Sequence, residues 1–511
     1  MAASSLLFAL AFPPVPLVAP VFICLVPLGV AVARLADAGH VRGTPDYRAA
    51  RRSAARLGFF FGLVGYALNL YWIALALAIY SKLAFLGYFA ALFVLAPVVC
   101  AAAVALFVAR QRTRWPMALL VPVIWVASEL VLNYLSDLAF PWLPLGLATA
   151  RIPMLAQAAE LSGVHGLTFC IAAVSGLVTD AWLRRAERRV VATRLAGGGV
   201  IVGALALYGV VRMPMIKTRA IGGVASVQPN IPQQEKWQAE HRDEIMGILT
   251  ALTRETMARR DAQLVLWPEA AMPDFLLNRP DHADTIRALT SRSGIPLLAG
   301  ALDAVRVGPN TYDAYNAALF VTAQGAIDTA VYRKTYLVPI VERVPFVNPN
   351  WFRGLPYFGL FARGTSEPPV YRLPMGRFGV LICYESIFPQ RSRYYRAHGA
   401  DFLINITNDA WFGRSLAPYQ HEAHLALRAI ENRVGIIRDA NTGISASIDP
   451  LGRFHGETEL ETRTSRTYQA ETTDIRTLYV RFGDWLGILC VTASLCLVFP
   501  WDRVRRTLHE R

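Results

Sequence analysis

The chain has 511 residues, 54% of them hydrophobic, and it carries a formal net charge of +14 at pH 7. This length allows two or more domains. A strongly basic chain can indicate a nucleic-acid-binding protein, but here much of the basic excess lies in short segments beside long apolar runs. That distribution argues against nucleic acid as a partner and is typical of a protein that crosses a membrane several times.

Residues 1–212 are expected to form a helical membrane domain, because long apolar runs follow one another along this part of the chain. Residues 57–81 and 84–109 contain no Asp, Glu, Lys or Arg, and each run is long enough to cross a bilayer. The sequence therefore predicts a multi-pass protein. Four further runs qualify as spans: 116–135, 162–182, 195–211 and 484–500.

The apolar start of the chain is interrupted by Pro13, Pro14 and Pro16. It predicts either two short passes within residues 1–33 or one pass with an irregular beginning. No Lys or Arg precedes this apolar run, which argues against a cleavable signal peptide.

Clusters of arginine at the ends of the apolar runs predict the orientation of the chain. By the positive-inside rule such clusters face the cytoplasm, and they alternate here with charge-poor connections at 82–83 and 134–161. Residues 213–483 are then an extracytoplasmic domain, and residues 484–511 are a last transmembrane helix with a cytoplasmic tail. The clusters are Arg42, Arg48, Arg51, Arg52 and Arg56; Arg110, Arg112 and Arg114; Arg184, Arg185, Arg188, Arg189 and Arg194; and Arg503, Arg505, Arg506 and Arg511.

Strand-like apolar runs alternate with polar helical stretches between residues 213 and 483, which predicts an α/β domain with buried strands. The region 335–375, rich in Pro, Gly and aromatic residues, is too long for an ordinary connection and is expected to form active-site loops. Strands are expected at 222–228, 263–267, 295–301, 316–322, 378–382, 401–406 and 444–449, and helices at 238–260, 281–293, 389–398 and 419–433.

Cys383 is the only cysteine outside a long apolar run. It ends the strand-like segment FGVLI and has no possible disulfide partner within the predicted extracytoplasmic domain. Outside the cytoplasm thiols tend to be oxidised in pairs, so an isolated thiol there favours a chemical use. The alternative is that Cys383 packs in a core as a small hydrophobic residue. The other cysteines are Cys24, Cys100, Cys170, Cys490 and Cys496.

Glu269 and Lys334 also follow strand-like runs, so both can meet Cys383 at one edge of a sheet. Glu269 can take the thiol proton if burial raises its pKa, and Lys334 can stabilise the thiolate and an oxyanion. This set suits acyl transfer through a thioester, although a surface position is the default for Lys and Glu. A zinc site is not expected, because the domain has no second cysteine.

Two further readings of isolated residues stay open. His421 and His424 lie three residues apart on a predicted helix, and either could serve as the base of a Cys–His pair, although structure or substrate contact is the preferred interpretation. Glu129 interrupts an apolar span, and an acid there is either functional or bonded to a neighbouring helix.

Five segments together carry a family resemblance: WPEAAMP (267–273), YRKTYLVPIVERVPF (332–346), GVLICYESIFP (379–389), NITNDAWFG (405–413) and RDANTGISASIDPLGR (438–453). This set resembles the nitrilase superfamily, whose Glu-Lys-Cys triad matches Glu269, Lys334 and Cys383. The N-terminal segments AFPPVP, LNLYWIA and FPWLPLG are similar to membrane-domain signatures, so the whole chain resembles the apolipoprotein N-acyltransferase family.

The resemblance implies a nitrilase-like α-β-β-α sandwich and further site residues. Glu342 corresponds to a supporting glutamate, and Tyr384 and Glu385 flank the nucleophile. This sequence has LVPIVE where the family usually has LVPFGE, and the lost glycine could change the loop around Glu342. Of the residues implied near the substrate, Trp237 lies on a lid segment, and the others are Trp411 and Arg438.

The resemblance also implies the reaction. The donor is a phospholipid, typically phosphatidylethanolamine, and the acceptor is the α-amine of a diacylglyceryl-cysteine on an apolipoprotein. No cofactor is needed, and the site is the cell inner membrane with the catalytic domain outside the cytoplasm. Two alternatives remain: a membrane-anchored amidase that uses water as the acceptor, and a transporter with a non-catalytic outer domain.

Overall fold

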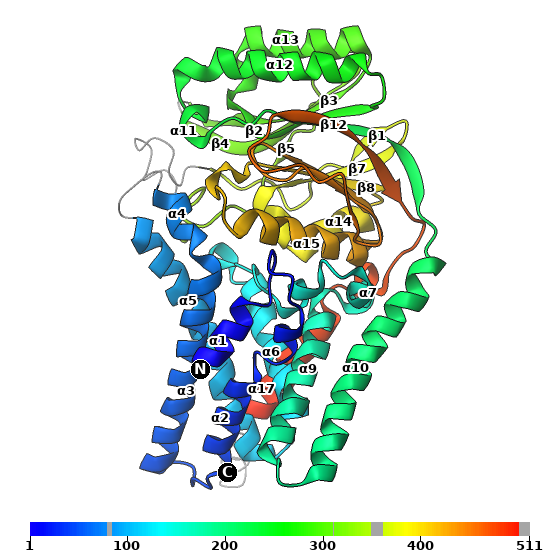
Figure 1. The fold of residues 1–511 in the computed structure, drawn as a ribbon. Helices are drawn as coiled ribbons and strands as arrows, with labels where there is room; N and C mark the ends of the chain where they lie inside the picture. The colour runs from blue at the N-terminus through cyan, green and yellow to red at the C-terminus, as the bar shows by residue number, and fades with distance from the viewer. Residues whose placement is uncertain (79–83, 310, 349–360, 500–511) are drawn as a thin grey trace, which may run out of the picture.

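A computed structural model of the chain describes residues 1–78, 84–309, 311–348 and 361–499. A bundle of helices forms one end of the molecule, and an α/β domain forms the other (Figure 1). The expected combination of a helical membrane domain and an α/β domain is confirmed.

The bundle is built from long apolar helices. Among the described residues, five helical stretches are long and apolar enough to cross a membrane, and α6 and α17 are apolar but shorter. The five stretches are Ala19–Asp37, Pro45–Leu70, Phe85–Thr113, Val164–Leu183 and Arg188–Met215. The main helices are α2 (Val26–Asp37), α3 (Pro45–Leu70), α5 (Ala84–Thr113), α6 (Met117–Asn133), α9 (Val164–Leu183), α10 (Arg188–Met215) and α17 (Trp485–Val498).

The start of the bundle bears on two expectations, the number of passes in residues 1–33 and the bounds of the span 57–81. A short helix α1 (Ala2–Ala9) and a 3-10 turn η1 (Ala19–Phe22) precede α2, so the described residues contain one candidate N-terminal span after an irregular start. The expected span 57–81 is wrong in its bounds. Helix α3 starts at Pro45, where the Thr44 hydroxyl accepts a hydrogen bond from the Tyr47 amide, and a separate α4 (Trp72–Ala78) follows it.

Glu129 on α6 binds neighbouring segments of the bundle. Its carboxylate accepts hydrogen bonds from the indole of Trp125 (2.9 Å), the amide of Leu145 (2.8 Å) and the hydroxyl of Thr168 (2.7 Å). These contacts tie α6 to α9 and to the turn η3 (Leu145–Thr149). Of the two readings of Glu129, the structure favours the acid that bonds its neighbours.

The arginine-rich ends of the helices lie far from the α/β domain. The connections from α2 to α3 and from α9 to α10 lie at the opposite end of the bundle (Figure 1). The guanidinium of Arg110, near the end of α5, binds Asp37 at the end of α2 with an Nε–Oδ1 distance of 2.9 Å. Three arginine clusters therefore share one end of the bundle, and the fourth, at 503–511, lies outside the described residues.

Two six-stranded sheets face each other in the α/β domain. The first has the order β12-β1-β2-β3-β4-β5 and the second β11-β10-β9-β8-β7-β6. Strands β1, β2 and β3 run parallel, as do β7, β8 and β9. The strands are β1 (Arg219–Gln228), β2 (Leu264–Phe275), β3 (Leu297–Gly308), β4 (Thr311–Val321), β5 (Tyr332–Arg333), β6 (Tyr371–Leu373), β7 (Gly376–Ile382), β8 (Phe402–Thr407), β9 (Gly435–Ala440), β10 (Ala446–Ile448), β11 (Phe454–His455) and β12 (Thr464–Thr472).

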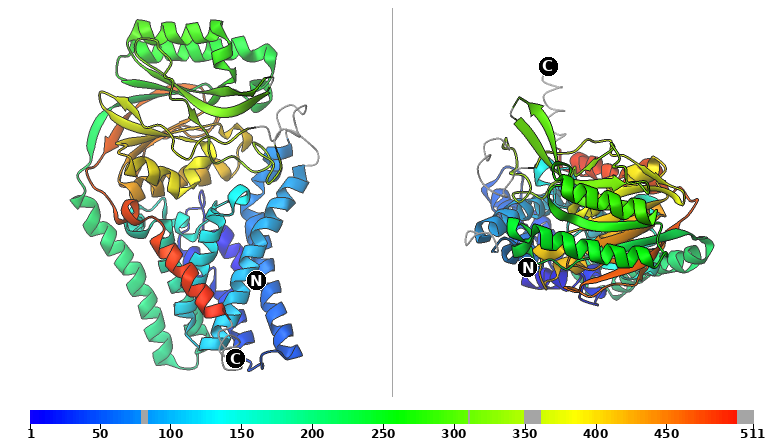
Figure 2. Two further views of the ribbon diagram at one scale, coloured as in Figure 1. Left: turned by 180° about the vertical axis from the view of Figure 1, so that it is seen from behind. Right: turned by 90° about the horizontal axis from the view of Figure 1, so that it is seen from above.

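Helices cover the outer face of each sheet, which gives the expected α-β-β-α sandwich. Helices α12 (Arg242–Ala258) and α13 (Pro280–Ser293) cover the first sheet, as both views in Figure 2 show. Helices α14 (Pro389–Ala397) and α15 (Ala417–Asn432) lie between the second sheet and the bundle (Figure 1). This sandwich sets α15 directly against the membrane domain.

Alternation of side chains along β2 builds the two cores of the sandwich. Val265 and Trp267 belong to the core beneath α12 and α13, whereas Leu264 and Leu266 belong to the core shared with the second sheet. Successive residues of a strand point to opposite faces, so one apolar run fills both cores. This is why the buried strands of the domain read as continuous apolar runs.

Candidate active site

Cys383 lies where β7 ends and the 3-10 turn η7 (Cys383–Ile387) begins. Its backbone has a φ of +50°, an uncommon conformation for a residue with a side chain, and its side chain is buried apart from a small exposed part. Such backbone conformations cost free energy and persist where the surrounding structure holds them.

Glu385 fixes the turn that carries Cys383. Its carboxylate accepts hydrogen bonds from the Ile382 amide (2.9 Å), the Thr335 amide (2.8 Å) and the Tyr336 amide (3.2 Å), and also from the Tyr332 hydroxyl. The Thr335 and Tyr336 amides belong to the segment directly after Lys334. Glu385 therefore ties the segment of the lysine to the turn of the cysteine, and it does not line the cavity described below.

Glu269 reaches the same place from the first sheet. The Lys334 ammonium donates to its Oε1 at 2.9 Å, the Asn316 amide group to Oε1 at 2.7 Å, and the Asn408 backbone amide to Oε2 at 2.9 Å. Gly300 on β3 allows this approach, because a Cβ there would lie 2.1 Å from the Pro268 carbonyl oxygen. Glu269 and Cys383 thus come from facing sheets to one site.

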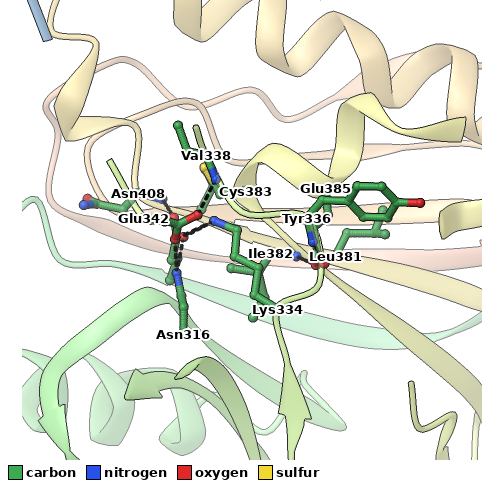
Figure 3. A network of polar contacts seen from close by, with 12 residues as sticks. Asn316, Lys334, Tyr336, Val338, Glu342, Leu381, Ile382, Cys383, Glu385 and Asn408 are labelled. Carbon is green, nitrogen blue, oxygen red and sulfur yellow. Dashed lines mark hydrogen bonds and ion pairs between the residues drawn. The ribbon is translucent and has the colours of Figure 1, made fainter. Parts of the chain in front are cut away.

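Glu342 shares the partners of Glu269. Its Oε1 accepts from Lys334 Nζ at 3.0 Å and from the Asn316 amide group at 2.9 Å, while its Oε2 accepts from the Val338 amide at 2.8 Å. Figure 3 shows Lys334 and Asn316 reaching the carboxylates together, with Cys383 close by. The lysine is therefore held between two buried carboxyl groups.

The loop before Glu342 tolerates the missing glycine of the LVPIVE segment. Val341, which replaces that glycine, has no positive φ, whereas Ile340 has a φ of +70°. The Val341 amide donates to the Pro339 carbonyl at 2.8 Å, which closes a strained three-residue γ-turn around Ile340. The strain falls on Ile340, and the Glu342 carboxyl group still reaches Lys334.

Burial and charge act in opposite directions on this cluster. Burial raises the pKa of Glu269, but the charge and hydrogen bond of Lys334 outweigh it, so the pKa lies below its ordinary value. Burial lowers the pKa of Lys334, yet the charges of Glu269 and Glu342 raise it well above its ordinary value. The condition set for Glu269 as the base, a pKa raised by burial, is not met, because Lys334 compensates the cost of burying the Glu269 charge.

The thiol of Cys383 is the group that burial keeps neutral. Burial raises the pKa of Cys383, the Glu269 charge raises it further, and the Lys334 charge opposes both effects. The resting site therefore holds a neutral thiol beside an ionised carboxylate and an ammonium. That combination can pass one proton from the sulfur to the carboxylate.

His421 does not form a Cys–His pair in this arrangement. Its Nε2 lies 3.0 Å from the Cys383 carbonyl oxygen and 2.9 Å from the Ser386 hydroxyl, and its Nδ1 lies 3.1 Å from Asp409. His424 Nε2 lies 2.9 Å from the carbonyl oxygen of Trp142 in the membrane domain. These contacts fit the preferred interpretation of both histidines, which is a structural role with His421 also facing the cavity.

Arg438 differs from the expectation that it contacts substrate. Its side chain on β9 is fully buried and does not line the cavity. It forms an ion pair with Asp409, and its guanidinium donates to Asn405 at 2.6 Å. Arg438 therefore holds Asp409, which in turn contacts His421 beneath the nucleophile turn.

A cavity of about 470 Å³ joins the catalytic cluster to the membrane domain. Trp237 and Trp411, two of the three residues expected near the substrate, line it, and so does Tyr384 beside Cys383. The described part of region 335–375 contributes the stretch 338–342, Pro345 and Phe361, and residues 349–360 lie outside the described residues. The catalytic cluster contributes Glu269, Asn316, Lys334, Glu342, Cys383 and Asn408, and the membrane domain contributes Trp72, Ile73, Ala76, Gly87, Ala90, Ala91, Val94, Leu95, Leu138, Phe140 and Trp142.

Three polar residues of the site were given no role from the sequence. Asn316 and Asn408 contact the carboxylates, and the Lys236 ammonium donates to the Glu269 carbonyl oxygen at 2.9 Å. Each stands beside a motif that was noticed: Asn316 starts a predicted strand, Asn408 follows another, and Lys236 precedes Trp237. Within the described residues, no group of three or more His, Cys, Asp or Glu side chains is arranged to hold a metal ion.

Comparisons with known proteins identify the family. The family described as carbon-nitrogen hydrolase matches residues 223–477, and the apolipoprotein N-acyltransferase N-terminal domain matches residues 4–177. A protein of Geobacter metallireducens named apolipoprotein N-acyltransferase is 32% identical over 473 residues, which cover 90% of this chain and 89% of the relative. This chain belongs to the apolipoprotein N-acyltransferase family. A relative of the same name from Rhodopseudomonas palustris is 30% identical over 94% of this chain and 90% of its own length.

The α/β domain is also similar to solved structures. An amidase from Nesterenkonia sp. is 18% identical and covers 52% of this chain and 95% of its own, with a TM-score of 0.35. The nitrilase-superfamily protein Nit3 of Saccharomyces cerevisiae is 19% identical and covers 50% of this chain and 90% of its own, with a TM-score of 0.38.

Replacement of Arg438 tests whether it positions Asp409 or binds substrate. Arg438→Met leaves the buried Asp409 charge without its partner, so we expect the free energy of unfolding to fall by about 3–5 kcal/mol. The measurement is thermal and denaturant unfolding in detergent, with Arg372→Met, an exposed arginine on β6, as the control. Unchanged stability with a raised KM for phospholipid would restore the substrate-binding role.

Proposed function

We propose that this protein transfers an acyl chain from a phospholipid to the N-terminal amine of an apolipoprotein, through a thioester on Cys383. The supporting observation is the single cavity that reaches from the Glu-Lys-Cys cluster to α4 and α5 of the membrane domain. A soluble amide would not need a cavity with an apolar membrane-domain wall. We also propose the domain division 1–212, 213–483 and 484–511.

The first half-reaction forms the acyl-enzyme. Glu269 accepts the thiol proton, and the Cys383 sulfur attacks the carbonyl carbon of the sn-1 ester of the donor, phosphatidylethanolamine. Lys334 uses two N–H groups for the carboxylates of Glu269 and Glu342, and its third stabilises the oxyanion together with the backbone amide after Cys383. The intermediate collapses, the lysophospholipid alkoxide takes the proton from Glu269, and the thioester remains.

The second half-reaction transfers the acyl chain from Cys383 to the amine and uses Glu269 again as the base. The free α-amine of the diacylglyceryl-cysteine attacks the thioester carbonyl, and Glu269 accepts the proton that the nitrogen loses. The Cys383 thiolate leaves and takes this proton back, which restores the resting enzyme. Donor and acceptor therefore react in turn, which gives ping-pong kinetics.

The residues around the triad have supporting roles in this proposal. Glu342 and Asn316 hold Lys334, Glu385 holds the nucleophile turn, and Tyr384 faces the cavity while its hydroxyl donates to the Ala139 carbonyl at 2.7 Å. Trp237 and Trp411 form part of the apolar wall that accepts lipid. No metal or cofactor takes part in these steps.

The catalytic domain is proposed to lie outside the cytoplasm, on the periplasmic side of the cell inner membrane. This orientation follows from the arginine clusters, which gather at the end of the bundle away from the α/β domain. Both lipid-anchored substrates then meet the cavity from the outer leaflet.

The triad proposal predicts the effect of two substitutions on the acyl-enzyme. Cys383→Ser should give no acyl adduct, because a serine hydroxyl is a far weaker nucleophile. Glu269→Gln should slow adduct formation by about 10²–10⁴-fold, because the base is lost. The measurement is intact-protein mass after incubation with phosphatidylethanolamine, with Cys170→Ser and Glu255→Gln as matched controls. A normal adduct in either active-site variant would contradict the role given to that residue.

The lifetime of the proposed thioester distinguishes an amine acceptor from water. Phospholipid alone should leave a long-lived adduct on Cys383, because the apolar cavity excludes water. A diacylglyceryl-cysteine peptide with a free α-amine should discharge the adduct, and the same peptide with a blocked amine should not. The fraction of acylated Cys383 is followed with time. Rapid release of free fatty acid without peptide would favour the membrane-anchored amidase.

The orientation predicts the behaviour of reporter fusions. A reporter fused after Met215, at the end of α10, should be active outside the cytoplasm, and one fused after Arg511 should be active inside it. Alkaline phosphatase and a fluorescent protein that folds only in the cytoplasm give opposite readings at each position. The reversed pattern would place Cys383 in the cytoplasm.

A further inference from the structure

A second lysine is buried beside the catalytic cluster. Lys236 ends the short helix α11 (Gln233–Lys236), and its side chain is only 1% exposed. Its Nζ donates to the backbone carbonyl oxygen of Glu269 at 2.9 Å. A lysine is almost never fully buried unless other groups compensate its charge, so this position calls for a physical reason.

The segment that carries Lys236 is fastened to the site at several points. Gln233 Oε1 accepts a hydrogen bond from the Asn408 side chain at 2.8 Å, and the Asn408 backbone amide binds Glu269. Trp237, the next residue after Lys236, lines the cavity. The α11 segment therefore contacts both the base and the substrate cavity.

The charges of the cluster give Lys236 a function. Glu269 and Glu342 are two buried carboxyl groups that share the single ammonium of Lys334. We propose that Lys236 is a positioning residue that supplies the second positive charge of the site, holding the Glu269 backbone and stabilising negative charge on Glu269 and Cys383. This inference rests on the proposed roles of these two residues.

The proton transfer shows why a second cation helps. When the thiol proton moves to Glu269, the negative charge moves from the carboxylate to the sulfur and the total charge stays the same. Lys334 and Lys236 flank this movement, so both charge distributions remain compensated within a site that excludes water.

The electrostatics of Lys236 agree with this role. Burial lowers the pKa of Lys236 to about 7, although the nearby Glu269 and Cys383 charges oppose that effect. The Lys236 charge in turn helps to lower the pKa of Glu269. The positive charge is present below the pKa of Lys236 and is lost as the pH rises through it. Other titratable groups around Glu269 and Cys383 are Lys334, Glu342, Tyr384, Asp409 and His421.

The test reads the thiolate of Cys383 without using the natural substrates. The initial rate of Cys383 alkylation by iodoacetamide is measured on the full-length protein in detergent across a pH series, with peptide mass spectrometry separating Cys383 from the other cysteines. Lys236→Met should lower the alkylation rate about tenfold below the pKa of Lys236, where the wild type carries the extra positive charge, and should change it little above that pH. Lys236→Arg should keep the wild-type rate below that pH and raise it above, because its charge is not lost, and Lys217→Met, at an exposed lysine, should match the wild type throughout.

A parallel measurement separates this inference from the proposed function. The rate of acyl-adduct formation from phosphatidylethanolamine is measured over the same pH series, and its acidic limb should move to higher pH in Lys236→Met. Absence of an adduct in the wild type would reject the proposed function, while the alkylation profiles would still decide the role of Lys236.

Two results would overturn the inference. One is an alkylation rate of Lys236→Met that falls by the same factor at every pH, so that its normalised profile coincides with that of the wild type. Such a result would indicate lost packing. If Lys236→Met does not fold, the test uses Lys236→Arg. Because arginine keeps its charge, the alkylation profile of this variant must lie at the same pH as the wild-type profile or at lower pH. A Lys236→Arg profile displaced to higher pH would be the second contradicting result.

Discussion

The site depends on a buried ammonium shared by two carboxyl groups. Lys334 contacts Glu269 and Glu342 at 2.9 and 3.0 Å, and Asn316 joins the same two carboxylates. Removing these charges from water is costly, and only close pairing with further hydrogen bonds compensates that cost. The backbone is arranged around this requirement: a glycine at 300 admits the segment of Glu269, and a strained turn at Ile340 delivers Glu342.

The desolvation that would protect the proposed thioester also works against its formation. An apolar cavity keeps water away, but burial also raises the pKa of the Cys383 thiol. Lys334 keeps the base, Glu269, ionised. The Cys383 sulfur can therefore keep its proton until a carbonyl group is in place to be attacked. The resting thiol is thereby less reactive toward oxidants than a thiolate would be.

The sequence predicted the parts of the molecule that show a periodic pattern of apolar residues, or a polar residue directly after an apolar run. Apolar runs predicted seven strands, and the groups that follow them, Glu269 and Cys383, do meet. Beyond these seven and the strand-like run before Lys334, four strands were missed. Strands β6 and β11 have only three and two residues, β9 is interrupted by the buried charges of Arg438 and Asp439, and β12 is a polar strand at the sheet edge. Lys236 and Asn316 were missed because single polar residues have no pattern, and their role appears only when distant segments pack together. The sequence also left open the direction in which the pKa of Glu269 shifts, because that direction depends on the 2.9 Å contact with Lys334, which only the folded chain forms.

The membrane domain is part of the active site as well as an anchor. Its LNLYWIA and FPWLPLG segments supply Trp72 and Trp142, which line the cavity and pack against each other with ring centroids 4.9 Å apart. Trp72 also contacts Phe412, and Trp142 stacks on His421, both from the α/β domain. Because aromatic packing of this kind fixes the relative position of its partners, the wall of the cavity is set by both domains at once. A soluble domain cut at its boundary would lose half of that wall, and with it the surface that excludes water from Cys383.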